Sequence, residues 1–492
     1  MTEGQRSFRR EIRLFDATMI VVGVMVGSGI FLVSGDIART VGGVGWLLAV
    51  WLFSGLVTLL AAACYGELAG LMPQAGGQYI YLREIFGRLA GFLYGWTLFM
   101  VIQTGSIAAV GMAFAKHLAL PAPDLGEQHV VLVVGGLHVN AAQLVAIASI
   151  ALLTWLNTLG LREGKLIQDG FTVAKVVALF GLVVAGLVIG RQADAIAANF
   201  RDIWAASRTA AGGDGLVIRE TIGGLGLVMA LGAASVGSLF ACDAWNNVTF
   251  TSGETVDPQR TITRALVGGV AVVVVLYLLT NLAYVFALPI AGTPDAADAA
   301  GRGIQFATDD RVGTAAASII LGPAAAGVMA VLVMIATFGC NNGMILTGAR
   351  VYYAMARDGL FFRQTGTLNA RRVPAVALLL QGVWSCVLCL SGRFGDLLDY
   401  VIFAVLLSYA ASVAGIFILR RRWPDAPRPW RAPGYPVLPA LYVLVALAIC
   451  VDLLIVKPRY TWPGLVIVAL GVPVYWLWGR GGRGGPGSGD DR

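Results

Sequence analysis

Long apolar runs alternate with short polar segments along the whole sequence. A helix needs about 20 consecutive apolar residues to cross the hydrocarbon core of a bilayer. Twelve runs meet or approach this length, so the pattern predicts twelve membrane-spanning helices. The runs cover residues 14–40, 44–71, 89–116, 139–159, 166–190, 223–252, 265–289, 323–355, 374–391, 397–419, 437–456 and 462–479.

Composition supports this prediction. Hydrophobic residues make up 58% of the 492 residues and charged residues only 13%, and the mean hydropathy is +0.77. Soluble proteins carry roughly twice that charged fraction, so the chain is expected to be an integral membrane protein whose partner is the lipid bilayer. The basic stretch before the first apolar run resembles a signal peptide, but no small-residue cleavage site follows it. The first run is therefore expected to be a retained span.

The basic residues predict the orientation of the spans. Roughly two thirds of the 35 lysines and arginines fall on the side of the N-terminus when every second loop is assigned to that side. This bias places both termini in the cytoplasm and the protein in the cell membrane. It also accounts for the net charge of +7 without a nucleic-acid partner.

The first apolar run contains Gly27, Ser28 and Gly29 near its middle. Each glycine inside a helix costs about 1 kcal/mol relative to alanine, so the cluster predicts a break at mid-membrane depth. One half-helix ends near Val26 and a second begins near Gly29. The free N–H groups and positive dipole end of the second half favour an anion, such as a carboxylate. The alternative is that the glycines permit close helix packing.

The sixth run contains a second interruption, formed by Asp243, Asn246 and Asn247. The run is too long for one perpendicular crossing at 1.5 Å per residue, which an unwound segment explains. The sixth span runs in the opposite direction to the first. Interrupted spans one and six are typical of an inverted repeat of five plus five spans, with the substrate site between the breaks.

Four motifs carry a resemblance to a known family: "GSGIF", "CYGELAGLMPQAGGQYIYLREIFG", "FACDAWNNVTFTSGETVDPQR" and "FGCNNGMILTGARVYYAMARDGLF". Together they resemble the amino acid–polyamine–organocation superfamily, and most closely its L-type amino acid transporter branch. The resemblance implies an all-α integral membrane protein with the LeuT-type 5+5 inverted repeat, twelve transmembrane helices, and spans 1 and 6 unwound.

This fold divides the chain into six parts. They are the cytoplasmic N-terminus 1–13, the first repeat 14–190, an extracellular loop 191–222, the second repeat 223–419, spans 11 and 12 in 420–479, and a disordered tail 480–492.

The resemblance also implies the substrate site. In the family the first break holds the substrate carboxylate, carbonyl groups at the second break hold the ammonium, and an aromatic residue before the second break closes over the substrate. The matching positions are Val26, Gly27, Ser28, Gly29, Ile30, Phe240, Ala241, Cys242 and Asp243.

Lys175 lies about 15 Å deeper in the membrane than Lys165. A lysine at mid-depth costs about 2.5–3.5 kcal/mol on insertion scales and marks function by default. It matches the position where related transporters carry a lysine in place of a sodium ion, which implies sodium-independent transport and a coupling role. The alternative is a structural tether between span five and the first break.

Three acidic residues lie in or next to apolar runs, and the sequence suggests a role for each. Asp243 is expected to attract the substrate ammonium, to bind a coupling proton or to cap the unwound segment. Glu67 is predicted to be a structural partner of the loop that follows span two, and Glu254 to belong to a cytoplasmic gate.

No nucleophile–base pair and no cluster of metal ligands appears in the sequence, so we expect no enzyme activity, no metal and no cofactor. Animal L-type relatives link to a single-span glycoprotein through a cysteine between spans three and four, and the corresponding segment 116–138 has no cysteine. The sequence therefore predicts a chain that transports without a disulfide-linked heavy chain.

The predicted function is that of a secondary transporter, moving an α-amino acid by alternating access through proton symport or amino acid exchange. The small or apolar pocket candidates Ile30, Cys242 and Cys340 favour a neutral amino acid, whereas Asp243 keeps a cationic one possible. The alternatives are a polyamine or cationic amino acid transporter and a sensor that binds an amino acid without moving it.

Overall fold

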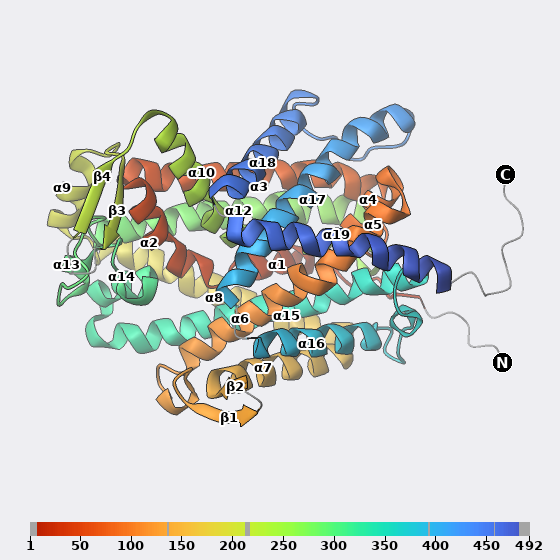
Figure 1. The fold of residues 1–492 in the computed structure, drawn as a ribbon, viewed down its shortest axis with the longest axis horizontal. Helices are drawn as coiled ribbons and strands as arrows, with labels where there is room; N and C mark the ends of the chain where they lie inside the picture. Colours follow the sequence, from red (N-terminus) through yellow and green to blue (C-terminus); the bar gives the residue numbers. More distant parts are fainter. Residues whose placement is uncertain (1–6, 135–136, 212–216, 392–393, 457, 482–492) are drawn as a thin grey trace, which may run out of the picture.

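The computed structural model describes residues 7–134, 137–211, 217–391, 394–456 and 458–481. Most of the predicted tail 480–492 and the first six residues of the predicted N-terminal segment lie outside these ranges. The described chain is mainly helical, with long helices running side by side (Figure 1).

The helices, including the π-helix η1 and the short 3-10 helices η2 to η6, are α1 (Leu14–Met25), α2 (Gly29–Val41), α3 (Val44–Leu71), α4 (Gln78–Phe86), α5 (Arg88–Thr97), η1 (Leu98–Ile102), α6 (Gln103–Leu118), η2 (Pro123–Leu125), α7 (Ala141–Thr158), α8 (Leu161–Val188), α9 (Ala193–Arg201), α10 (Gly224–Ala241), α11 (Asn247–Phe250), η3 (Ser252–Glu254), α12 (Pro258–Ala287), α13 (Ala299–Arg302), η4 (Thr308–Asp310), α14 (Val312–Leu321), η5 (Gly322–Ala324), α15 (Ala325–Arg357), η6 (Arg363–Gly366), α16 (Ala375–Leu390), α17 (Phe394–Arg422), α18 (Val437–Val456) and α19 (Pro458–Gly481).

The predicted apolar runs correspond to helices. Within the described ranges, ten helices are long and apolar enough to cross a membrane, and the bent pair α1–α2 makes an eleventh. The helix α16, with 16 residues, is apolar but shorter. Each of the twelve predicted runs overlaps at least one of these helices. The chain is therefore a multi-pass membrane protein.

Helices far apart in the sequence pack in pairs. Helix α2 packs against α10, α3 against α12, α6 against α15, and α7 against α16. In terms of the predicted spans, these pairs are one with six, two with seven, three with eight and four with nine. The helix α1 lies among α8, α12 and α15, so the first break is enclosed by helices of both predicted repeats.

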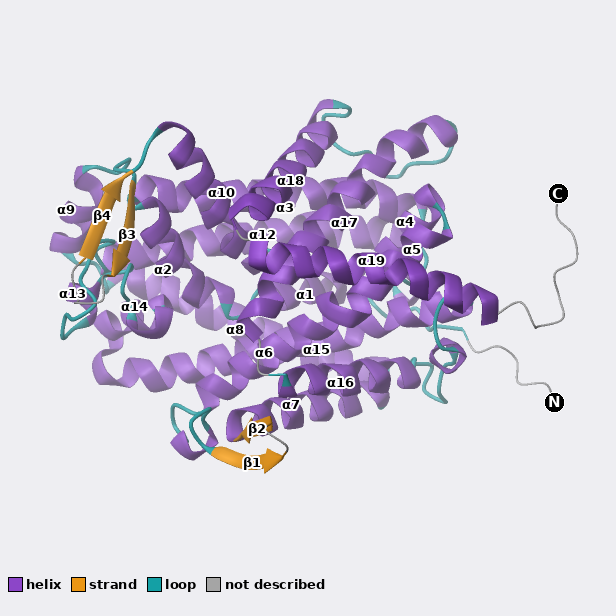
Figure 2. Ribbon diagram, viewed as in Figure 1, coloured by secondary structure: helices purple, strands orange, loops and turns teal. Residues whose placement is uncertain are grey.

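The expectation of an all-α fold is wrong for the loops. Two antiparallel hairpins are present, β1 (Val130–Val134) with β2 (Leu137–Asn140), and β3 (Ser207–Ala211) with β4 (Val217–Thr221) (Figure 2). Strand β1 has the sequence VVLVV, and β-branched residues favour strands. The run is too short to be a span. The β3–β4 hairpin lies with α9 and α13 at one end of the helix bundle, and α4 lies at the other end (Figure 1).

Candidate binding site at two helix breaks

The first predicted break is present. Helix α1 ends at Met25 and α2 begins at Gly29, and the two helices are bent by 43°. Ser28 and Gly29 are partly exposed, whereas Val26, Gly27 and Ile30 are buried. The side chain of Ser28 makes no capping hydrogen bond. The first N–H groups of a helix have no partner within the helix, so the start of α2 presents donors and a positive dipole end.

The second predicted break is also present. Helix α10 ends at Ala241 and the next helix, α11, begins only at Asn247. Between them Ala244 has a φ of 65°, a left-handed conformation that costs a non-glycine residue about 1–2 kcal/mol. Trp245 anchors this segment, because it is buried with its ring 4.9 Å from Tyr65 and 5.0 Å from Tyr409. Asp243, by contrast, is partly exposed.

The two breaks lie side by side. The Tyr277 hydroxyl, on α12, is 2.8 Å from the Met25 carbonyl oxygen and 3.2 Å from the Ala241 carbonyl oxygen. A Cβ on Gly29 would lie 2.8 Å from the Cβ of Ala241, closer than real Cβ atoms approach. The structure therefore brings the predicted residues of the two breaks together, and a glycine at position 29 permits this contact.

Lys175 holds the end of α1. It is fully buried on α8, and its Nζ donates hydrogen bonds to the carbonyl oxygens of Gly23, Val26 (2.8 Å) and Ala336 (3.2 Å). An ammonium has three donors, and a cation is favourable at a helix C-terminus. The structure thus contains the tether that the sequence offered as the alternative role of Lys175, and the tether reaches α15 as well.

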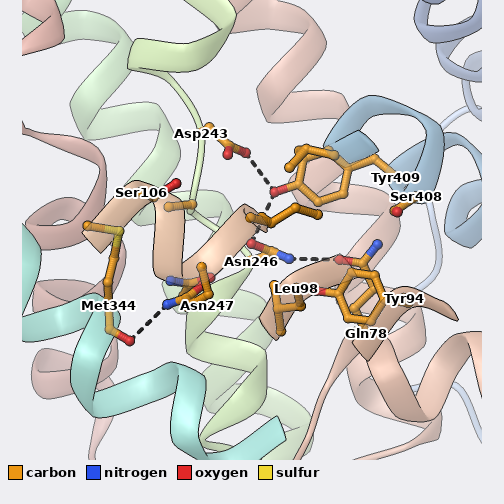
Figure 3. A pocket seen from close by; sticks show the side chains of 14 residues that line it. Gln78, Tyr94, Leu98, Ser106, Asp243, Asn246, Asn247, Met344, Ser408 and Tyr409 are labelled. Carbon is orange, nitrogen blue, oxygen red and sulfur yellow. Dashed lines mark hydrogen bonds between the residues drawn. The ribbon is translucent and has the colours of Figure 1, made fainter. Parts of the chain in front are cut away.

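A small cavity lies beside the second break (Figure 3). The Tyr409 hydroxyl is 2.7 Å from Asp243 Oδ1 and 3.0 Å from Asn246 Oδ1, and Asn246 Nδ2 donates to Gln78 Oε1 at 2.8 Å. Asn247 Nδ2 is buried in this region and has no hydrogen-bond partner among the described residues. The free volume is about 20 Å³, which is room for one water molecule. A ligand larger than a water molecule can bind here only if these side chains move.

Of the nine predicted substrate positions, only Asp243 lines this cavity. The four residues of the first break, Val26 to Gly29, do not line it. Ile30 and Cys340 are buried in helix packing, with Cys340 Sγ 3.0 Å from the Val24 carbonyl oxygen. Cys242 lines a second small cavity, which shares Asp243 and Tyr409 with the first. Phe240 is partly buried against a hydrophobic cluster of α10, α17 and α18 and lines neither cavity.

Sequence reasoning missed the tyrosines of the site. Tyr277 and Tyr409 lie in apolar runs, where a tyrosine is consistent with ordinary packing, so only the contacts reveal their roles. Gln78 lies in the second of the four family motifs, but the sequence did not predict a role for it. The available signal was polarity, since Tyr409 and Ser408 are adjacent in the otherwise apolar stretch 401–411.

The prediction for Glu67 is wrong. Its carboxylate accepts from Arg420 at 2.7 Å and Arg428 at 3.2 Å, and from the backbone N–H of Ala432. It therefore binds the end of α17 and the segment after it, not the loop that follows α3.

Comparison with known proteins identifies the family. Residues 12–477 match the family model described as amino acid permease. The chain belongs to the amino acid permease family. This confirms the resemblance to the amino acid–polyamine–organocation superfamily that the motifs suggested.

Three relatives match the permease over nearly all of its length. Large neutral amino acids transporter small subunit 2 of Mus musculus is 29% identical over 96% of the permease and 82% of the relative. Asc-type amino acid transporter 1 of Mus musculus is 29% identical over 96% and 81%, and b(0,+)-type amino acid transporter 1 of Mus musculus is 27% identical over 96% and 88%. The family and these relatives are transporters, not enzymes.

The relatives do not support the prediction that the chain works without a heavy chain. The first of them is named a small subunit, so the predicted absence of a disulfide-linked heavy chain gains no support from the comparison.

Proposed function

We propose that the permease is a secondary transporter that moves a neutral α-amino acid across the cell membrane by alternating access. The observation that carries this proposal is the contact between the two helix breaks. The N–H groups at the start of α2 attract the carboxylate, and the carbonyl end of α10 attracts the ammonium. Both ends of an amino acid zwitterion are thus recognised by main-chain groups, independently of its side chain.

We further propose a LeuT-type 5+5 inverted repeat within twelve spans, with both termini in the cytoplasm. Support comes from the pairing of spans one to four with spans six to nine, which is expected for repeats related by a pseudo-two-fold axis. The asymmetry of the basic residues supports the orientation.

We propose that transport is sodium-independent. The Lys175 ammonium already occupies the group of carbonyl oxygens at the end of α1. A second cation at the same place would be repelled by this charge at low dielectric. The driving force is then proton symport or exchange against an internal amino acid.

A cationic amino acid is the second candidate substrate, and Asp243 favours it. Asp243 is a partly exposed residue at the second break and lines the small cavity there, where its carboxylate would pair with a positively charged side chain or polyamine.

Proteoliposomes that contain this chain alone test these proposals. We expect uptake of labelled neutral amino acids that is unchanged when choline replaces sodium, and that depends on either a pH gradient or an internal amino acid. Competition by lysine, arginine or spermidine that exceeds competition by neutral amino acids would favour the second candidate. Binding without uptake would indicate a sensor, and uptake that requires a co-reconstituted partner would refute transport by the chain alone.

A further inference from the structure

A groove away from the breaks opens between α3, α10 and α18, which lie next to one another in Figure 1. Its volume is about 650 Å³, and apolar side chains make up almost all of its lining. We call it the α3–α10–α18 groove. It runs along each helix, from Trp46 to Phe53 on α3, from Leu225 to Ser235 on α10, and from Val445 to Ile455 on α18.

The length of the groove matches one leaflet of a bilayer. Its walls extend over eight to eleven residues per helix, or roughly 10–15 Å from the first residue to the last, and half of a typical hydrocarbon core is about 15 Å. Trp46 lies at the start of α3, and its indole N–H donates to the Trp204 carbonyl oxygen at 2.9 Å. Tryptophans of this kind gather at the membrane–water interface. The groove therefore extends from the interface toward the bilayer centre.

Asp452 is the single ionisable residue among those that line the groove. Its Oδ2 is buried and has no hydrogen-bond partner in the described ranges. The carboxylate faces α10 at Gly232, where an added Cβ would lie 2.7 Å from Oδ2. Asp452 as a whole is partly exposed, but a buried carboxylate oxygen without a partner in apolar surroundings is costly, so a cationic ligand would be favourable at this position.

The depth of Asp452 indicates the kind of cation. It lies four residues before the end of α18 at Val456, about 6 Å from the helix end. Asp452 therefore lies nearer to one end of this span than to its middle, within reach of a lipid head group. A ligand that satisfies both the apolar groove and the carboxylate combines an acyl chain with a positively charged head group.

We infer that the α3–α10–α18 groove binds a phospholipid with a primary ammonium in its head group, with an acyl chain along the groove and the ammonium on Asp452. A primary ammonium offers N–H donors to the carboxylate, whereas a quaternary ammonium offers none. Since α10 forms one wall and ends at the second break, the lipid would stabilise one position of this helix. The inference does not depend on which substrate is transported.

The test measures thermal unfolding of the purified full chain in detergent, titrated with phosphatidylethanolamine, phosphatidylcholine or phosphatidylglycerol of identical acyl chains. We expect phosphatidylethanolamine to stabilise the wild type at the lowest concentration. In Asp452→Asn, about tenfold more of this lipid should be needed, since a charge-assisted hydrogen bond is lost. The responses to the other two lipids should not change.

The matched control is Asp295→Asn, in an exposed loop, which should retain the wild-type preference. Equal responses of the wild type to all three lipids would overturn the inference. So would a preference for phosphatidylethanolamine that survives in Asp452→Asn, because the lipid would then bind elsewhere. A loss of stability in Asp452→Asn that is the same with every lipid would assign Asp452 a purely structural role and also overturn it.

Discussion

At the scale of single residues, Lys175 links three helices through one ammonium group. All three of its recorded hydrogen bonds go to backbone carbonyl oxygens, two of them at the end of α1 and one on α15. The charge therefore compensates the negative end of the α1 dipole and fixes the position at which the first break begins.

We expect Lys175→Ala to abolish amino acid uptake while the protein still accumulates in the membrane, because the carbonyl groups at the break lose their shared donor. Uptake into proteoliposomes, normalised to the amount of protein, measures this. The control is Lys116→Ala, which removes an exposed ion pair with Glu127 at 3.2 Å. Such pairs contribute only about 0–1 kcal/mol, so uptake should be nearly normal. Unchanged uptake in Lys175→Ala would remove this residue from the mechanism.

The contact between Gly29 and Ala241 leads to a second prediction. The methyl group of Gly29→Ala would push the two breaks apart, since the nearest atoms lie 2.8 and 3.2 Å from the new Cβ. Overpacking of this kind costs about 1–3 kcal/mol. We expect a lower melting temperature and strongly reduced uptake.

Gly226→Ala on α10 is the matched control, because no atom lies within 4 Å of its added Cβ. It should retain both stability and uptake. Equal behaviour of the two variants would mean that the contact between the breaks is not tight.

The residues of the site were predictable to different degrees. Glycines, a lysine and an aspartate in apolar runs are costly in a membrane, and the sequence therefore pointed to Gly27, Gly29, Lys175 and Asp243. A tyrosine carries no such cost, and the role of Tyr277 depends on a contact between chain segments more than 200 residues apart, which no local pattern reveals.

At the scale of elements, an ion pair joins the segment after the second break to α15. Arg350 contacts both carboxylate oxygens of Glu254 at 2.8 and 3.0 Å, and both side chains are almost completely buried. The backbone oxygen of Glu254 also accepts from the N–H groups of Glu11 and Ile12. The segment that precedes α1 is thereby attached to η3, which is consistent with the predicted gate.

We expect Arg350→Met to destabilise the protein by about 3–5 kcal/mol, because it leaves a buried carboxylate unpaired. The double variant Glu254→Gln/Arg350→Met should recover part of this loss. Thermal unfolding in detergent measures both. A double variant that is less stable than Arg350→Met would show that the pair acts through other contacts.

The helices differ in whether a local sequence pattern can predict them. Hydropathy located every long helix, because the membrane imposes length and composition on a span. It did not reveal the π-helix η1, although Leu98 and Ile102 of this element line the cavity beside Asp243. Such wide turns often occur at functional sites. They depend on packing with neighbouring helices rather than on a periodic sequence signal.

At the scale of the whole molecule, the proposed topology places the ends of α7 on opposite sides of the membrane. Asp124 precedes this helix and Arg162 follows it, and both are exposed. A membrane-impermeant thiol reagent should label Asp124→Cys in intact cells, but Arg162→Cys only after permeabilisation. Wild-type protein is the blank, since five of its six cysteines are buried. The reverse pattern would invert the proposed orientation.

The overall architecture was more predictable than its details. The count of apolar runs and the two breaks in opposite directions already pointed to paired repeats, and the packing of α3 with α12 and of α6 with α15 agrees with them. The hairpins β1–β2 and β3–β4 were missed, since the membrane places no constraint on the segments outside it.

The Tyr277 hydroxyl has one proton and two acceptors, one at the end of α1 and one at the end of α10. It can satisfy only one of them at a time, so its contribution to holding these helix ends together is a single neutral hydrogen bond, worth about 0.5–1.5 kcal/mol. At ambient temperature this is only one to three times the thermal energy. Beside the packing of Gly29 against Ala241, Tyr277 thus adds a polar link between the two breaks that thermal fluctuations can break and re-form.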